Sequence, residues 1–214
     1  MSLKVGLVAT IATLPVAFAL AWFLARAKVR GKILIEAFVY LPLVVPPVVT
    51  GWMLLLVFAP SGPLGAMSAG VLFKWTGAAI AAGVMALPLM VRAMRLSIEA
   101  VDQRLEGAAR TLGAGRWRVF RTITLPLSMP GVLAGTVLGF ARSLGEFGAT
   151  ITFVSNVPGQ TQTLPLAIYA ALQRPDGDAV ALRLSALSVL IALLALVASE
   201  LLARRMRAAT IHGV

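Results

Sequence analysis

The sequence predicts an all-α integral membrane protein, and three observations support this class. Hydrophobic residues make up 59% of the 214 residues and charged residues only 13%, about half the charged share of a soluble domain. The mean hydropathy is +0.92. Apolar runs of about twenty residues recur, the length at which a helix crosses the ~30 Å hydrocarbon layer. A transmembrane barrel would instead show alternating strands of about ten residues, and the chain lacks that alternation.

The first expected span covers residues 5–25. A cleaved signal peptide is the rival interpretation. However, this run is longer than the usual signal core of about 7–15 residues, and the stronger positive charge, in residues 26–32, follows it rather than precedes it. We therefore expect a retained helix.

The second expected span covers residues 33–58 and contains three prolines between positions 42 and 47. Proline removes a backbone donor and kinks a helix, which lipid tolerates only where neighbours satisfy the freed carbonyl groups. Two interpretations of this proline stretch stay open, a moving gate element and a fixed bend. Glycine and proline in residues 59–68 then indicate a turn-rich loop.

Three further spans are expected at residues 75–94, 129–153 and 179–203, and a polar insert, residues 95–127, separates the first two of them. Residues 164–173 are apolar but too few to cross the membrane, so we place them at its surface or in a re-entrant segment. The whole chain therefore reads as a single transmembrane domain with about five helices.

The 19 Lys and Arg residues are distributed unevenly around these spans. Fourteen of them fall in segments 26–32, 92–121 and 204–207, which share one side of a five-span protein. Four lie on the other side, and Arg142 lies within a span. Because basic residues mark the cytoplasmic side, we expect the amino terminus outside and the carboxyl terminus in the cytoplasm. This pattern accounts for the net charge of +11 without a nucleic-acid partner.

Several kinds of chemistry lack the residues that they need. The chain has no cysteine and one histidine, His212, so we expect neither a metal site nor a nucleophile–base cluster. The Gly31-Lys32 pair is followed by Ile33 and follows no glycine-rich loop, so a phosphate-binding motif is missing. We therefore expect no enzymatic activity and no cofactor bound by this chain. An ion-gradient carrier is disfavoured because the five spans show no internal repeat.

The polar insert contains a motif at residues 105–126. Leu105–Leu112 is expected to be a helix because Ala, Arg and Leu favour one, and Gly113 is expected to end it. Residues 115–124 mix arginines with large apolar side chains, an amphipathic pattern suited to the membrane surface. Within the helix, one narrow apolar face is expected to contain Leu105, Ala108, Ala109 and Leu112.

The spacing Ala-Ala-x3-Gly-x9-Ile-x-Leu-Pro, from Ala108 to Pro126, resembles the signature loop of the permease subunits of binding-protein-dependent ABC importers. In that family the loop forms a short cytoplasmic coupling helix that docks into a separate ATPase subunit. The family has Glu at the position of Gly107, so the acidic contact is either absent here or made by Glu106. The residues alone leave an alternative, a basic loop that only anchors the bundle to anionic lipid. The resemblance implies coupling roles for Glu106, Gly107, Ala108, Ala109, Arg110, Leu112 and Gly113.

Residues 41–49, 88–93 and 139–156 resemble, more specifically, the permeases of molybdate importers; sulfate permeases carry a related version of the last stretch. The resemblance implies the type I ABC importer permease fold and alternating access, with ATP used by a partner subunit. It implies import of molybdate or tungstate across the bacterial cytoplasmic (inner) membrane; the alternative is sulfate or another tetrahedral oxyanion. The implied partners are a second copy of the chain, two ABC ATPase subunits and a periplasmic oxyanion-binding protein.

Charged residues inside the expected fourth span mark a candidate translocation path. Arg142 and Glu146 lie four residues apart, on one face of the expected helix, and charges at membrane depth usually face a bundle interior or an aqueous path. Two interpretations stay open: a pore-lining pair whose arginine meets a dianion, and a mutual salt bridge that fixes packing. Nearby hydroxyl groups could contact a passing oxyanion or join helices. They belong to Ser143, Thr150 and Thr152.

Overall fold

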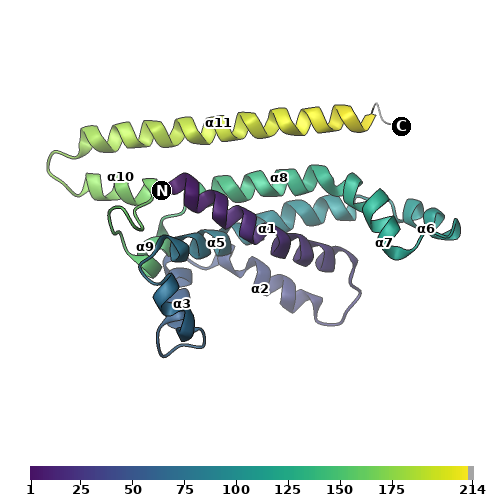
Figure 1. The fold of residues 1–214 in the computed structure, drawn as a ribbon, viewed down its shortest axis with the longest axis horizontal. Coiled ribbons are helices and arrows are strands. Elements are labelled where there is room, and N and C mark those ends of the chain that lie inside the picture. Colours follow the sequence, from purple (N-terminus) through teal and green to yellow (C-terminus); the bar gives the residue numbers. More distant parts are fainter. Residues whose placement is uncertain (212–214) are drawn as a thin grey trace.

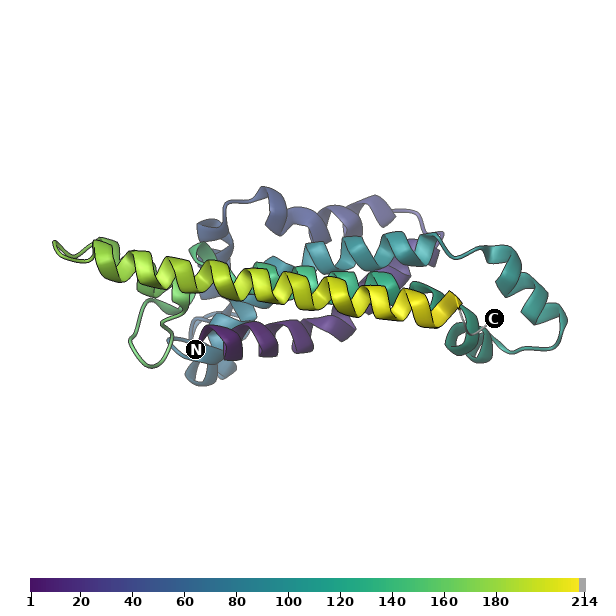
Figure 2. The same cartoon turned by 90° about the horizontal axis from the view of Figure 1, so that it is seen from above.

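Four long helices lie side by side in the computed structural model, which describes the backbone of residues 1–211 and the side chains of residues 1–197 and 201 (Figures 1 and 2). Each belongs to a helical segment long and apolar enough to cross a membrane, so the all-α membrane class is confirmed. His212 lies outside the described residues. The four are α1 (Ser2–Arg26), α5 (Trp75–Glu99), α8 (Leu125–Leu144) and α11 (Asp178–Ile211).

Helix α5 is the centre of the bundle and packs against both α1 and α8. The first half of its buried face is rich in alanine: Ala78, Ala79, Ala81, Ala82 and Ala86. On α8 a glycine recurs every fourth residue and lies against Ser97, Met94 or Met90 of α5. These glycines are Gly131, Gly135 and Gly139. Small residues allow close approach of two helices, which is the main source of helix association where no water is displaced.

The segment expected as the second span is not one helix. It forms α2 (Lys32–Val44) and α3 (Pro47–Phe58), whose axes differ by 115°. The break falls at consecutive prolines, Pro46 and Pro47. These lack N–H donors and keep the residue before each of them out of the helical region. The expected interruption by prolines is confirmed, although it is a sharp turn between two helices; the described part of the chain has up to five spans if the bent pair counts as one.

The fourth expected span also has different limits. A short helix α7 (Arg116–Val119) and a π-helical turn η2 (Phe120–Thr124) run directly into α8, so the helix begins well before position 129. It ends at Leu144, because glycines at positions 145 and 148 are poor helix formers. The predicted span 129–153 thus includes a break, after which α9 (Gly148–Val154) forms a separate short helix packed on α3.

The remaining elements are short. Two single turns, η1 (Gly65–Met67) and α4 (Ser68–Val71), occupy the connection between α3 and α5. Helix α10 (Leu164–Leu172) has nine residues, too few to cross a bilayer, as expected. The Leu164 N–H donates to Ser2 Oγ at 2.6 Å and so ties α10 to the start of α1.

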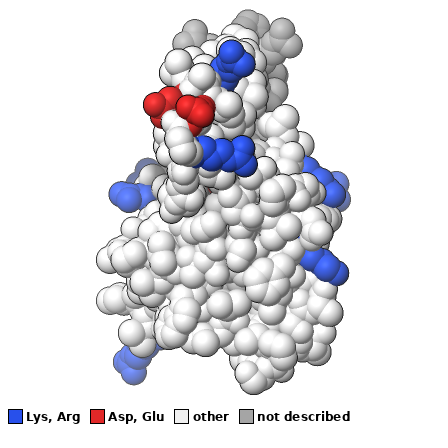
Figure 3. Space-filling model, turned by 90° about the vertical axis from the view of Figure 1, so that its left-hand side faces the viewer, with Lys and Arg blue, Asp and Glu red and all other residues white. Residues whose placement is uncertain are grey.

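The two ends of the bundle differ in character. Helix α6 (Gln103–Thr111) and α7 lie beyond one end of the long helices, where α11 also finishes (Figures 1 and 2). The opposite end holds the starts of α1 and α5, and there Lys4 Nζ lies 3.7 Å from the centre of the Trp75 ring. Seen from that end, the surface is mostly uncharged, with separate Lys and Arg side chains and one group of Asp and Glu side chains in its upper part (Figure 3).

Candidate functional site

Helix α6 has the start and stop signals of a well-defined short helix. The Asp102 carboxylate accepts a hydrogen bond from the Arg104 N–H at 2.8 Å and so caps the first turn. At the other end Gly113 adopts a φ of 87°, and the Ala114 N–H donates to the Ala109 carbonyl at 3.0 Å. This geometry closes the helix at a left-handed glycine. The predicted helix and its end at Gly113 are confirmed, and the helix begins two residues earlier than expected.

The expected apolar face of α6 is open to the surroundings. Leu105 is 51% exposed and Leu112 is 88% exposed. Ala108 between them is also exposed, whereas Ala109 is half-buried. Gly107 is exposed as well, and a Cβ added there would have no atom within 4 Å. The side of the helix that could enter a groove of another protein therefore carries small and apolar residues, which the described part of this chain leaves exposed.

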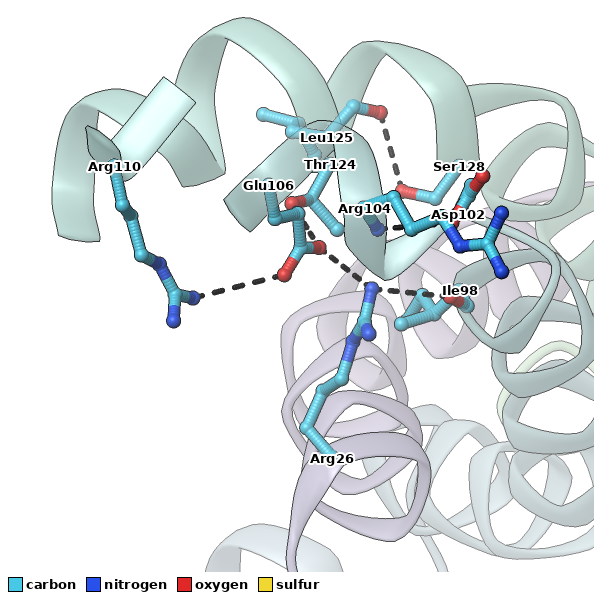
Figure 4. A network of polar contacts seen from close by, with 9 residues as sticks. All are labelled: Arg26, Ile98, Asp102, Arg104, Glu106, Arg110, Thr124, Leu125 and Ser128. Atoms are coloured by element: carbon cyan, nitrogen blue, oxygen red, sulfur yellow. Dashed lines mark hydrogen bonds and ion pairs between the residues drawn. The ribbon is translucent and has the colours of Figure 1, made fainter. Parts of the chain in front are cut away.

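The opposite side of α6 is fixed to the body of the protein through Glu106, which is 7% exposed (Figure 4). Its Oε1 accepts from Arg26 Nη2 at 2.6 Å and from Thr124 Oγ1 at 2.8 Å. Its Oε2 lies 3.7 Å from Arg110 Nη2. Arg26 also donates to the Ile98 carbonyl at 3.4 Å. One carboxylate thus joins α6 to the last residue of α1 and to the turn before α8.

The segment after α6 has an amphipathic arrangement, although its apolar side packs on the protein. Val119 is buried, and the Phe120 ring lies 4.9 Å from the ring of Trp22 and 6.2 Å from that of Phe18, both on α1. The arginines at 116, 118 and 121 are exposed. Residues 115–124 are therefore an integral part of the bundle as well as a basic surface.

The pair Arg142 and Glu146 is formed, with 2.7 Å between Nη1 and Oε2. The two residues do not share a helix as expected, because Glu146 lies in the break after α8. Its other oxygen accepts from the Ala149 N–H at 2.8 Å and so caps the first turn of α9. Glu146 is 2% exposed, whereas the Arg142 side chain is 26% exposed. The carboxylate thus has a structural role in addition to neutralising the arginine.

The three hydroxyl residues near this pair do not share one environment. Ser143 continues the glycine face of α8 that packs against α5, and it is 5% exposed. Thr150 is 1% exposed. Thr152 is half-buried and donates to the Gly148 carbonyl at 2.9 Å within α9. Ser143 and Thr150 therefore pack inside one chain, and their contact with a passing anion stays a prediction.

Sequence reasoning missed three residues that position α6. Asp102 could have been found, because an aspartate just before a helical stretch is a standard capping signal. Arg26 and Thr124 could not, since 80 and 18 residues separate them from Glu106 and no local pattern links them.

Comparison with known proteins identifies relatives over most of the chain. Residues 14–208 match the model of the family described as binding-protein-dependent transport system inner membrane component. The molybdenum transport system permease protein ModB of Escherichia coli K12 is 53% identical over 95% of this chain and 91% of its own length. The sulfate transport system permease protein CysT of the same organism is 36% identical, over 80% of this chain and 65% of its own length.

Solved structures share the fold. The inward-facing MetNI methionine ABC transporter superposes with a TM-score of 0.77 over 96% of this chain and 92% of the other, at 16% identity.

Proposed function

The chain belongs to the family of inner membrane components of binding-protein-dependent transport systems, and from this premise we propose that it is the permease through which an ATP-driven ABC importer carries molybdate into the cytoplasm. The relative with 53% identity is a molybdenum transport permease. The sulfate relative is less similar and matches less of the chain, so sulfate is the weaker candidate. Tungstate is a tetrahedral dianion like molybdate, so we include it among the substrates.

The observation that carries this proposal is the uncovered apolar face of α6. This helix lies beyond the end of the membrane-spanning helices and is fixed from behind by Glu106 (Figures 1 and 4). A helix that only anchored the bundle to lipid would lie in the interface plane with its apolar face in the bilayer. Helix-in-groove docking instead needs small and apolar residues on an accessible face, as Ala108 and Leu112 provide here. We assign this face to an ABC ATPase subunit, which binds and hydrolyses the ATP.

The proposed orientation of the chain in the membrane follows from the charges at the end that contains α6. The end with α6 carries most of the basic residues, which supports its assignment to the cytoplasm, with the amino terminus outside. The working unit would contain two copies of the chain around a path on the two-fold axis, because closed two-fold symmetry is the commonest assembly. Two ATPase subunits on one face and a periplasmic oxyanion-binding protein on the other complete the proposed importer.

The experiment that tests coupling is the substitution Ala108→Glu. A bulky charge on the exposed face should block docking, so reconstituted vesicles should lose molybdate uptake and the ATP hydrolysis that loaded binding protein stimulates, while the permease stays in the membrane. Ala100→Glu is the matched control, because Ala100 is exposed near the same end but lies outside α6. Normal coupling in the Ala108 variant would refute the docking assignment. Competition of uptake by sulfate in the unmodified protein decides between the two anions.

A further inference from the structure

A cationic cavity of about 510 Å³ lies between the end of α1, the turn that follows it, and α6. Gln103, Glu106, Gly107 and Arg110 line it from α6, which is the face opposite the exposed apolar one. Its wall on the α1 side includes the ring of Trp22. The four cationic side chains on its walls are Arg26, Lys28, Lys32 and Arg110.

The charges on these walls are not balanced. Glu106 is the one carboxylate against the four cations, and both of its oxygens are already engaged by Arg26, Thr124 and Arg110. Lys28 and Lys32 form no ion pair with any side chain that the structure describes.

Arg26 adds a second observation. Its Nε is buried and has no hydrogen-bond acceptor within the described part of the chain. A buried donor without a partner is unfavourable, and it adds to the positive charge beside this cavity that no carboxylate offsets. Arginine and lysine together are the side chains that most often bind phosphate, through planar and point-charge contacts respectively.

We propose that this cavity binds the phosphate group of an anionic phospholipid. Trp22 and the last turn of α1 place the cavity at the level where a span leaves the bilayer, and indole rings favour that interface. Basic pockets between helices on the cytoplasmic side are known binding sites for lipid headgroups. The volume is within the range of small-molecule sites and exceeds what a single tetrahedral anion needs. A free oxyanion offers the same oxygen chemistry and is the other source to be tested.

The bound phosphate would act on α6. It would contact Arg110 of α6 together with Lys28 and Lys32 next to α1, and so hold the helix against the membrane domain from the side opposite the ATPase. Without it, Arg26 and Arg110 share the single carboxylate of Glu106, and Lys28 and Lys32 have no anionic partner among the described side chains. The lipid site rests on the proposed function only because that function places this end of the molecule in the cytoplasm. Lipid binding itself does not depend on the transported anion.

The test is retention of lipid by the complete transporter complex. The complex is purified in detergent with equal amounts of phosphatidylglycerol and phosphatidylcholine, and bound lipid is counted by native mass spectrometry. We expect the unmodified complex to retain phosphatidylglycerol selectively, and Lys28→Gln with Lys32→Gln to lower that retention about thirtyfold. Lys74→Gln with Arg174→Gln removes the same charge from exposed positions outside the cavity and should leave retention unchanged. Lys28→Arg with Lys32→Arg should restore it.

Three results would overturn the assignment. Equal retention by the lysine variant and the unmodified complex would place the lipid elsewhere. Absence of retained phosphatidylglycerol from the complete complex would mean that the ATPase or solvent fills the cavity. Thermal stabilisation by inorganic phosphate at millimolar concentration, without an effect of phosphatidylglycerol, would identify a free-anion site. Molybdate uptake is measured in parallel, so a failure of the lipid site is distinguishable from a failure of the proposed transport function.

Discussion

Glu106→Ala should release α6 from the membrane domain. The carboxylate makes the 2.6 Å charge-assisted bond to Arg26 and the 2.8 Å bond to Thr124, and these tie α6 to α1 and to the turn before α8. Alanine removes both and leaves the Arg26 guanidinium without its anionic partner. Because α6 itself keeps its cap at Asp102, the helix should persist while its attachment weakens.

The free-energy cost of Glu106→Ala follows from the burial of the ion pair between Arg26 and Glu106. The side chains of Arg26 and Glu106 are 16% and 10% exposed, so solvent screens their interaction only weakly. Removing one partner of a buried pair costs about 3–5 kcal/mol. We take about 3 kcal/mol, because Arg26 also borders a cavity that water can enter, and loss of an ion pair at such a site tends to the lower limit. That free energy corresponds to a roughly 100-fold larger population of detached α6.

Hydrogen–deuterium exchange in lipid nanodiscs measures this population directly. The amides of α6 should exchange about 100-fold faster in Glu106→Ala, while those of α5 and α8 keep their rates. Glu99→Ala is the matched control: its carboxylate is 38% exposed, and Arg95 keeps a second partner in Glu36. Its loss should cost about 0.5 kcal/mol. Unchanged exchange of α6 in Glu106→Ala would refute the reasoning that this carboxylate anchors the helix.

Two glycine substitutions should change stability in opposite directions. Gly131→Val places a branched side chain against Ser97 at the contact of α8 and α5, and overpacking should lower thermal stability by about 1–3 kcal/mol. Gly107→Ala adds a methyl group in open space within α6 and should stabilise that helix by about 1 kcal/mol, visible as slower amide exchange. At the other end of the bundle, Arg142→Ala should lower both folding yield and anion uptake because it leaves buried Glu146 unpaired. Adding Glu146→Gln should restore the yield but not uptake; full uptake by the double variant would show that the pair is only structural.

The sequence predicts α6 well because every determinant of that helix is local. Helix-forming residues fill it, and the glycine at 113 ends it by adopting a left-handed conformation. The long apolar helices were predictable for a similar reason, since hydropathy averaged over about twenty residues identifies segments that can cross a membrane. The limits of those helices were less accurate. Polar residues extend α5 beyond position 94 and extend the helix of α8 to before position 129, and hydropathy carries no helix signal in such residues.

Hydropathy does not report backbone hydrogen bonds, so the prolines indicated the first break but not its angle, and the break after α8 was not predicted. Residues 33–58 and 129–153 are apolar throughout, yet each turns in the middle. In the first, consecutive prolines remove two donors, the two helix axes differ by 115°, and α3 packs on α9. In the second, a side chain replaces the missing backbone acceptor, because Glu146 caps α9. A periodic pattern therefore placed Arg142 and Glu146 on one helix, although their contact is made across a helix end.

The ion pairs Arg26–Glu106 and Arg142–Glu146 share a geometry that explains why each lies where a long helix ends. Arg26 is the last residue of α1 and Arg142 lies in the last turn of α8, where the negative end of the helix dipole favours a cation. Their partners lie at the opposite pole of a short helix: Glu106 in the first turn of α6 and Glu146 at the start of α9. Each pair therefore joins the carboxyl end of a long span to the amino end of a short helix, and both dipoles favour the charges that the pair brings together. Glu106 also accepts from Thr124, so the same carboxylate fixes α6 to the turn before α8, and α9 is held further by its packing on α3.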